Sequence, residues 1–265
     1  MNGVNKTLYI PLYGKASVSK KGIILKDKKA EMIWEREGFP LRGKAKFKWL
    51  TYYMGMRSAV FDSWVKEKLE KYPSASVLYI GCGMDSRIER IGNIKNTWYD
   101  IDFPSVIQER KKYYQETESY HMLCADASKT EWIADLPKTE QVIVIMEGVS
   151  MYLKLQELVQ LLDALQKHYK NVHIFMDCYT EFAARASKYK NPVNSVGVQN
   201  LHGLDEPGYL EEQTRIGFVK EHDLTPDYLI NELKGFERQF FKCVLGGNMA
   251  KKMYRLFEYQ TNRQP

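Results

Sequence analysis

The sequence has few cysteines, and no two of them lie close together. The four residues Cys82, Cys124, Cys178 and Cys243 are widely spaced and form no C-x-x-C pair. Structural zinc sites of the cysteine type use closely spaced cysteine pairs, and a disulfide framework uses many cysteines in a short chain. The pattern therefore argues against both, and we expect buried free thiols.

Long apolar runs are missing as well. No segment approaches the roughly 18 consecutive apolar residues that a membrane-spanning helix needs. The first residues, MNGVNKTLYIPLYGKA, lack the charged and then apolar build of a signal peptide. We therefore expect a cytoplasmic protein without a membrane partner.

A strong excess of one charge is also absent. The formal net charge is +6 over 265 residues, and the lysines are scattered in short clusters such as KKGIILKDKK. Nucleic-acid binding would favour one longer basic stripe, so we expect no nucleic-acid partner. A mild positive field can instead favour an anionic substrate or cofactor group. The chain is 44% hydrophobic and long enough to bury a sizeable core.

Five apolar runs alternate with helical stretches in the middle of the chain. They are VLYI at 77–80, TWYDI at 97–101, HMLCA at 121–125, QVIVIM at 141–146 and VHIFM at 172–176. This alternation predicts an α/β fold with a parallel sheet covered by helices on both faces. Apolar residues recur at helical spacing over 155–169, which predicts a crossover helix with one buried face. They are Leu155, Leu158, Val159, Leu162 and Leu165.

The remainder of the chain divides into parts around this core at 76–178. Residues 1–75 hold no comparable strand series, but EMIWER and residues 49–72 predict helices, so we expect an N-terminal helical cap. Residues 179–224 are polar and interrupted by glycine and proline, which predicts a lid or substrate-facing segment. Residues 225–265 contain a predicted helix, DYLINELKGF, and a closing strand, MYRLFEY.

A glycine turn follows the first apolar run. In VLYIGCGMDSR, residues 77–87, a predicted strand leads into Gly81 and Gly83, whose backbone can approach a ligand closely. Nucleotide-cofactor sites begin in this way. A dinucleotide oxidoreductase would carry a third glycine where this chain has Ser86, which speaks against that class. A bare G-x-G is also common in turns that bind nothing.

Acidic residues follow the next three predicted strands. Asp102 comes 21 positions after Gly81, Asp126 follows the third run, and Glu147 follows the fourth. Ligands of open parallel sheets bind at the carboxyl ends of the strands. An acid about 20 residues past the turn can accept hydrogen bonds from both ribose hydroxyls. An acid after the third strand can accept one from an adenine amino group.

These acids also have structural interpretations. Asp102 is followed by Pro104, and Asp126 by a short helical stretch, so either can cap a helix. Glu147 is different, because an acid at the end of the apolar run VIVIM is costly to bury unless it is paired or binds a ligand.

An arginine is the natural partner for the carboxylate of a cofactor with an amino-acid end. Arg57 lies in the predicted helix YYMGMRSAVFDSW, and its guanidinium matches a carboxylate with two parallel bonds. Arg87 in the glycine turn is its rival, although we expect Arg87 to pair with a nearby acid and fasten the turn together with Asp85. A surface ion pair is the other interpretation of Arg57.

The ordered set of motifs resembles one known family. The motifs are TLYIPLYGKA, GCGMDSR, WYDIDFPSVI, CADAS, EGVSMYL and NLHGLDEP, and they run through nearly the whole chain. The set resembles the leucine carboxyl methyltransferase superfamily, and most closely its bacterial branch of tetracenomycin-type polyketide O-methyltransferases. This resemblance implies a class I methyltransferase fold: a Rossmann-like, seven-stranded, mostly parallel sheet with helices on both faces, a final antiparallel strand and an N-terminal helical cap.

The resemblance also implies an S-adenosylmethionine cofactor and the residues that hold it. Lys15 and Arg57 would reach its methionine carboxylate, and Gly81, with Gly83 in the same turn, would lie against it. Glu147 would lie beside the methionine amino group.

The adenosine end of the cofactor would meet the next two strands. By the same resemblance, Asp102 would bind the ribose, and Asp126 with the backbone of Ala127 would meet the adenine. Relatives often carry leucine where this chain has Ala127, so the change concerns the fine packing of the site.

We therefore predict an S-adenosylmethionine-dependent O-methyltransferase that methylates a carboxylate or hydroxyl of a small-molecule acceptor and releases S-adenosylhomocysteine. Such a displacement needs alignment and exclusion of water, and a base is optional. No catalytic residue is therefore assigned, and Tyr152, Tyr179 and His202 are candidates on the acceptor side. The alternatives are a protein carboxyl methyltransferase, an NAD-dependent oxidoreductase, and a cofactor-binding protein without methyl transfer.

Overall fold

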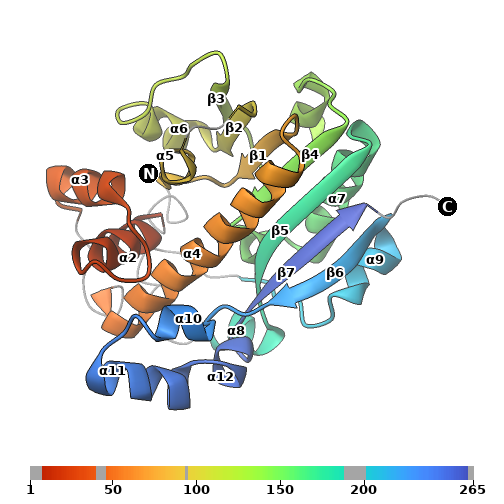
Figure 1. Cartoon of the computed structure of the whole chain (residues 1–265). Helices are drawn as coiled ribbons and strands as arrows, with labels where there is room; N and C mark the ends of the chain where they lie inside the picture. The colour runs from red at the N-terminus through yellow and green to blue at the C-terminus, as the bar shows by residue number, and fades with distance from the viewer. Residues whose placement is uncertain (1–7, 40–45, 93–94, 188–200, 262–265) are drawn as a thin grey trace.

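A computed structural model of the chain describes residues 8–39, 46–92, 95–187 and 201–261 (Figure 1). Seven strands form one sheet in the order β3-β2-β1-β4-β5-β7-β6. The strands are β1 (Ser76–Ile80), β2 (Trp98–Asp102), β3 (Tyr120–Cys124), β4 (Gln141–Met146), β5 (Asn171–Tyr179), β6 (Ile216–His222) and β7 (Tyr254–Thr261). The five apolar runs of the sequence are thus the five strands of the predicted core.

The sheet is parallel from β1 to β5 and antiparallel at β7. β7 lies between β5 and β6 and runs opposite to both. The order reverses at β1, because the chain leaves β1 toward β2 on one side and returns to β4 on the other. The predicted class I methyltransferase sheet, with its antiparallel strand MYRLFEY, is confirmed.

Alternate residues of the central strands face two separate cores. Val77 and Ile143 pack toward the long helix α4 (Lys48–Lys71), whereas Leu78 and Val144 pack toward α7 (Leu155–His168). Figure 1 shows α4 and α7 on opposite faces of the sheet. Strands buried on both faces read as continuous apolar runs, which is why the sequence revealed them. In α7 the buried stripe also contains Leu161, which the predicted spacing omitted.

In the described residues before the sheet, the chain forms α2 (Tyr9–Lys20), α3 (Lys28–Glu37) and α4. The sequence predicted α3 and α4 but not α2, in which Pro11 and Gly14 weaken the helical signal. Gly14 is explained by packing, because a Cβ atom there would lie 2.6 Å from Cβ of Met54 on α4. Glycine therefore lets α2 and α4 cross closely.

The predicted lid at 179–224 needs a correction. It contains α8 (Glu181–Ala186) and α9 (Gly208–Gln213), but residues 216–222 form β6, which extends the sheet beyond β7. β6 is an edge strand, and apart from Ile216 and Gly217 its residues are not buried, so it carried no apolar run. The part of this segment at 188–200 lies outside the described residues.

The predicted helix DYLINELKGF is broken. It consists of α10 (Asp227–Ile230) and the start of α11 (Gly235–Phe240), because Gly235 adopts a positive φ of 52°. A π turn (Phe241–Leu245) and α12 (Asn248–Lys251) follow before β7. The remaining helices are α5 (Arg87–Ile91) and α6 (Pro104–Arg110). None of the described helices is long and apolar enough to cross a membrane.

The expectation of four buried thiols is wrong for two of them. Cys82 and Cys178 are buried, whereas Cys124 and Cys243 are exposed. Cys124 ends β3, which is an edge strand, and Cys243 lies in the π turn on the surface. All four are free.

The close crossing of α2 and α4 gives a test of the fold. Gly14→Ala would force Cβ against Met54, and overpacking of this kind costs about 1–3 kcal/mol. We expect urea denaturation to show this loss in the free energy of unfolding. Gly208→Ala in α9 is the matched control, because a Cβ atom there meets no heavy atom within 4 Å. Equal stability of the two variants would contradict the close crossing.

Candidate functional site

A cavity of about 1110 Å³ opens at the carboxyl ends of the parallel strands. It spans the ends of β1, β2, β3 and β4, next to the point where strand order reverses, which is where open α/β sheets bind ligands. All eight residues predicted to bind the cofactor line it. They are Lys15, Arg57, Gly81, Gly83, Asp102, Asp126, Ala127 and Glu147.

The glycine turn forms one wall of the cavity. Gly81 and Gly83 adopt positive φ angles of 68° and 53°. A Cβ atom on Gly81 would lie 2.1 Å from the Val149 side chain, so the strand end can approach the cavity only as glycine. Ser86, which replaces a third glycine, donates a hydrogen bond to Asp27 at 2.6 Å. This hydrogen bond connects the glycine turn to Asp27, which directly precedes α3.

Asp102 is held at the end of β2 by two backbone groups. The amide of Gly83 donates to its Oδ2 at 2.8 Å and the amide of Phe103 to its Oδ1 at 2.7 Å. Burial nevertheless raises the pKa of Asp102 to about 6, because two neutral donors do not replace the lost water. Each oxygen keeps a further lone pair on the cavity wall.

Asp126 combines a turn-forming oxygen with an open one. Its Oδ1 accepts hydrogen bonds from the amide of Ser128 at 2.9 Å and from the Ser128 hydroxyl at 2.7 Å. Its Oδ2 accepts no hydrogen bond from the part of the chain that the structure describes. Asp126 therefore forms a turn with Ser128 and does not cap the short helix that begins at Glu131, and its other oxygen can accept from a ligand.

Glu147 lies at the end of β4 in the most highly charged part of the cavity wall. Its carboxylate accepts a hydrogen bond from Arg57 Nε at 3.0 Å and from the Ser58 hydroxyl at 2.8 Å, and it pairs with Arg87. Burial by itself would raise its pKa, but Arg87 and Arg57 together lower it to about 2. Glu147 is ionised at neutral pH.

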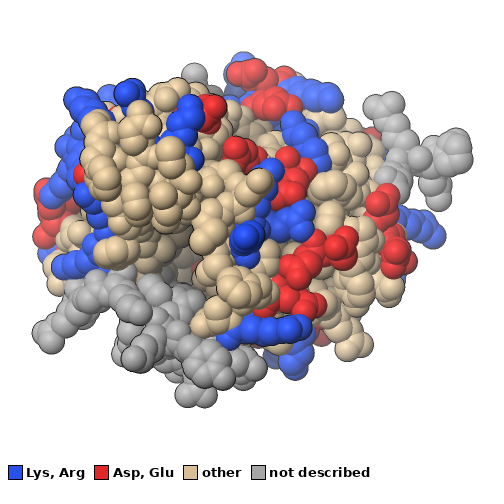
Figure 2. Space-filling model, turned by 90° about the horizontal axis from the view of Figure 1, so that it is seen from below, with Lys and Arg blue, Asp and Glu red and all other residues tan. Residues whose placement is uncertain are grey.

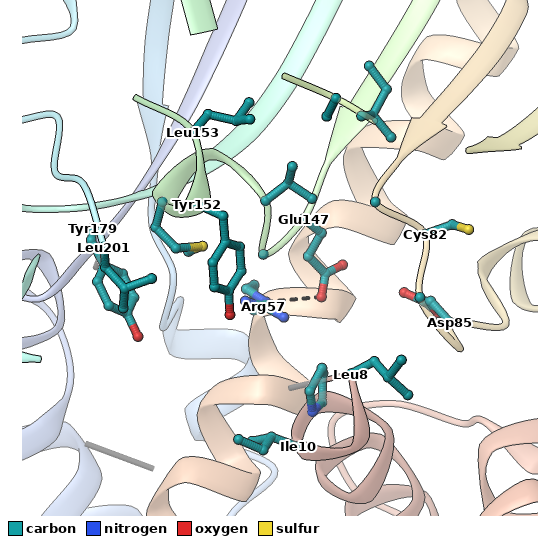
Figure 3. Close-up of a pocket in the computed structure, with 18 of the residues that line it drawn as sticks. Leu8, Ile10, Arg57, Cys82, Asp85, Glu147, Tyr152, Leu153, Tyr179 and Leu201 are labelled. Atoms are coloured by element: carbon teal, nitrogen blue, oxygen red, sulfur yellow. Dashed lines mark hydrogen bonds and ion pairs between the residues drawn. The ribbon is translucent and has the colours of Figure 1, made fainter. Parts of the chain in front are cut away.

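Arg57 reaches the cavity from α4, and two of its guanidinium nitrogens, Nε and Nη1, make hydrogen bonds within the protein. Besides Glu147, it donates from Nη1 to Asp177 Oδ2 at 2.9 Å and contacts the Tyr254 hydroxyl (Figure 3). Its Nη2 makes no hydrogen bond within the described part of the chain. Arg57 is thus oriented by two carboxylates and keeps a donor available. Lys15, in contrast, pairs with Asp85 at 3.1 Å.

These pairs belong to one continuous network of nine charged side chains. It links Lys15, Arg57, Arg87 and Arg90 with Asp27, Asp62, Asp85, Glu147 and Asp177. Five carboxylates against four cations leave one negative charge when all are ionised. Arg87 is fully buried and pairs with Asp62 at 2.7 Å, as expected of a residue that fastens the turn.

Asp177 belongs to this network and holds residues of the cavity wall in place. The sequence analysis missed it. It ends the apolar stretch of β5, and it accepts from the backbone amide of Gly148 at 2.7 Å as well as from Arg57 and Tyr254. The signal that marked Glu147, an acid after a strongly apolar strand, is also present in VHIFMD. Applied to β5, the same argument would have found it.

The sequence analysis also missed a buried ion pair, Arg110 with Asp100, that supports the glycine turn. Arg110 at the end of α6 donates to the backbone carbonyls of Asp85 at 2.6 Å and Gly83 at 3.1 Å. It also pairs with Asp100, and both side chains are fully buried. Asp100 is two residues before Asp102 on β2, and it further accepts from the Tyr120 hydroxyl at 2.6 Å.

The cavity continues beyond Arg57, away from the glycine turn. Figure 3 shows Tyr152, Tyr179 and Leu201 on this side and Cys82 and Asp85 on the other. The three predicted acceptor-side residues, Tyr152, Tyr179 and His202, all line the cavity. The backbone amide of His202 donates to the carbonyl of Met151 at 2.8 Å, which holds this segment at the end of β4. Among the described residues, no group of His, Cys, Asp and Glu could hold a metal ion.

Comparisons with known proteins identify the family of the chain. The model of the family described as Leucine carboxyl methyltransferase matches residues 12–166. The chain is 26% identical over 219 residues to the tetracenomycin polyketide synthesis O-methyltransferase TcmP of Streptomyces glaucescens, with 80% of each chain covered. It is also 26% identical over 234 residues to the S-adenosyl-L-methionine-dependent methyltransferase dpfgK of Gibberella zeae, covering 80% of this chain and 78% of that one.

Solved structures show the same fold at low sequence identity. A putative methyltransferase from Thermobifida fusca superposes with a TM-score of 0.59 at 12% identity, covering 94% of both chains. Magnesium protoporphyrin IX methyltransferase from Synechocystis, solved with bound S-adenosylhomocysteine, gives 0.52 at 10% identity and covers 89% of this chain and 94% of that one.

The Arg110–Asp100 pair predicts a large loss of stability when it is broken. Arg110→Met would leave the Asp100 carboxylate buried without its cation, which costs about 3–5 kcal/mol. Lys170→Met, which breaks the exposed pair with Glu140, is the control, and it should change the free energy of unfolding by less than about 1 kcal/mol. Chemical denaturation measures both. A small effect of Arg110→Met would show that the turn does not depend on this pair.

Proposed function

Because the chain belongs to the leucine carboxyl methyltransferase family and is an S-adenosylmethionine-dependent methyltransferase, we propose that its cavity holds that cofactor beside a small-molecule acceptor, whose carboxylate or hydroxyl it methylates. The row of groups at the carboxyl ends of four adjacent strands carries this proposal. In sheet order they are Glu147 after β4, Gly81 and Gly83 after β1, Asp102 after β2 and Asp126 after β3.

The chemistry of this row fits the parts of the cofactor in sequence. Arg57 has a free Nη2 for the methionine carboxylate, and Asp102 has lone pairs for two ribose hydroxyls. Asp126 keeps Oδ2 for the adenine amino group. Gly81 leaves room for close approach between the two ends. Lys15 touches the same wall, but its pairing with Asp85 makes it a weaker candidate than Arg57.

The charge of the network also fits. S-adenosylmethionine carries a sulfonium, an ammonium and a carboxylate, so its net charge is one positive. The nine side chains of the network carry one negative charge when all are ionised, and the carboxylates of Asp102 and Asp126 on the cavity wall lie outside this sum. A positively charged cofactor bound in the cavity would offset part of this negative charge.

Two ligands fit the size of the cavity. A site for one drug-sized ligand has a volume of about 300–1000 Å³, and this cavity exceeds that range. The part beyond Arg57 is lined largely by apolar and aromatic side chains, among them Met151, Tyr152, Tyr179 and Leu201. We place the acceptor there, and the lining favours an apolar or aromatic acceptor.

The residues of the chain contribute alignment more than proton transfer. The bound cofactor supplies an electrophilic methyl group, which transfers by direct displacement. The strand-end groups fix where that methyl group points, and the apolar lining excludes water that would compete with the acceptor. A carboxylate acceptor needs no base, whereas for a hydroxyl acceptor His202 is a candidate base on the acceptor side of the lining.

The raised pKa of Asp102 indicates that its carboxylate does not stabilise the fold at neutral pH, which is consistent with a role in binding. Its pKa of about 6 in the folded chain lies above the ordinary value of 3.8. A carboxyl group with a raised folded pKa favours folding at pH values below 3.8, and this contribution is lost as the pH rises through about 6. Ionised Asp102 therefore destabilises the folded chain at neutral pH.

We predict that Asp102→Asn weakens S-adenosylmethionine binding at least tenfold without lowering stability. In the parent chain, protonation of Asp102 removes the acceptor that the ribose hydroxyls need. Affinity should therefore fall by up to about tenfold per pH unit below pH 6 and level off above it. Calorimetric titrations between about pH 5 and 7 measure this dependence.

The matched control for this pH dependence is the variant itself. Asp102→Asn has no carboxyl group at this position, so its weaker binding should not change across the same pH range. A parent affinity that is independent of pH, or a variant that binds like the parent, would remove Asp102 from the ribose site.

The acceptor class needs a separate experiment. We incubate the enzyme with cell extract and S-adenosylmethionine labelled in its methyl group, and then separate proteins from small molecules. The proposal predicts label in the small-molecule fraction. Base-labile label on a protein would instead indicate a protein carboxyl methyltransferase. Cofactor binding without label in either fraction would indicate a protein that has lost its chemistry.

A further inference from the structure

The segment of residues 234–253, between α10 and β7, carries a large share of the positive charge of the chain. It contains five basic residues and one acid, which gives it a net charge of +4, whereas the whole chain has a net charge of +6. The basic residues are Lys234, Arg238, Lys242, Lys251 and Lys252, and the acid is Glu237. The sequence as a whole has no basic stripe, but this segment is locally basic.

The same segment exposes large apolar side chains. Phe236 is 74% exposed, Met249 51% and Val244 45%. Phe236, Phe240 and Val244 are four residues apart, so they follow one side of α11 and the π turn. Phe47, next to the start of α4, is 57% exposed. Figure 2, a view from below, shows a broad uncharged area with Lys and Arg side chains, and some Asp and Glu side chains, along its edges.

This basic apolar surface, defined as residues 234–253 with Phe47, borders the cavity. The Tyr53 hydroxyl donates to the carbonyl of Leu245, and the ring of Tyr53 lies 5.0 Å from that of Phe241. Tyr53 also lines the cavity, as do Ala250 and Met253 from the surface itself. Met253 is partly exposed, so apolar side chains continue from the surface to the acceptor side of the cavity.

We propose that the basic apolar surface docks the protein on an anionic lipid membrane. Exposed phenylalanine and aliphatic side chains enter the boundary between headgroups and acyl chains, while surrounding lysines and arginines attract anionic headgroups. Neither feature alone would suffice, because scattered exposed apolar residues and charged faces are common. Their combination on one surface beside a large cavity is what points to a membrane. Surface docking needs no spanning helix, so the proposal is consistent with the described helices, although it departs from the expectation of no membrane partner.

Other partners fit these observations less well. A second copy in a symmetric dimer would bring two surfaces of net charge +4 together, which repel each other. An acidic protein would complement the lysines but would leave Phe236 and Val244 unexplained unless it also carried an apolar patch. Docking on a membrane would bring Met253 and the acceptor side of the cavity close to the lipid, in which an apolar acceptor would dissolve.

Cosedimentation of the full chain with lipid vesicles tests this proposal independently of methyl transfer. We use vesicles of phosphatidylcholine and vesicles of phosphatidylcholine mixed with phosphatidylglycerol. The proposal predicts binding to the mixed vesicles that weakens with added salt, and at least tenfold weaker binding to phosphatidylcholine alone. Equal binding to both vesicles, or none to either, would overturn it.

Two double variants separate the apolar and the charged contributions. Phe236→Ser with Val244→Ser removes exposed apolar side chains, and Lys242→Glu with Lys251→Glu reverses two exposed charges. Each should reduce binding to the mixed vesicles at least tenfold. Lys66→Glu with Lys138→Glu makes the same change of charge at exposed positions elsewhere and should bind like the parent.

The same variants exclude the other partners. All three should bind S-adenosylhomocysteine like the parent, which shows that they fold. Loss of vesicle binding in the charge variant alone would show that the exposed apolar side chains do not enter the bilayer, and it would overturn the proposed docking. A parent dimer that dissociates in the apolar variant would overturn it in favour of a second copy. Light scattering measures that oligomeric state.

Discussion

The carboxylate of Glu147 is shared by two buried arginines from different helices, and the arrangement of the cavity depends on it. Arg57 comes from α4 and Arg87 from α5, and Asp177 on β5 holds Arg57 from its other side. Each of these charges is buried, so each needs the others to offset the loss of water. The network therefore fixes α4 and the β1 turn against the ends of β4 and β5 in one arrangement.

The groups that we assign to the cofactor differ in how much of this network they use. Arg57 and Glu147 belong to it and would orient the methionine end of the ligand. Asp102 and Asp126 lie outside it, and they are held by backbone amides and by Ser128 with acceptor capacity to spare. The cavity thus has a rigid charged network near Arg57 and Glu147 and available hydrogen-bond acceptors at Asp102 and Asp126. This arrangement suits a ligand with a zwitterionic amino-acid end and a nucleoside end.

Much of this could be predicted from the sequence, because burial on both faces makes strands such as QVIVIM read as apolar runs. The strand-end acids followed from the same runs, since an acid directly after such a strand must lie at its carboxyl end. Three features could not be predicted: β6, whose polar residues lie at the sheet edge; α2, in which Gly14 is set by contact with Met54; and the pair of Arg110 with Asp100. The first two depend on contacts between segments far apart in the chain, and the third on a pairing across ten residues between β2 and α6 that no hydrophobic pattern marks.

The basic apolar surface was missed for a related reason. The net charge of the whole chain is modest, and only the folded structure brings Phe47 near the lysines and aromatic rings of residues 234–253, where Trp49 packs on Phe240 at 5.0 Å. The composition of the whole chain does not reveal a local concentration of basic and apolar residues. Because this surface lies beside the acceptor side of the cavity, docking on a membrane would let an apolar acceptor enter the site from the lipid.

A crystal structure of the chain with S-adenosylhomocysteine tests the central claim most directly. The account predicts that the ligand lies across the ends of β4, β1, β2 and β3. Its carboxylate should contact Arg57, its ribose hydroxyls Asp102, and its adenine amino group Asp126. A ligand bound elsewhere, or one in the cavity whose ribose and adenine contact neither of these two acids, would contradict it.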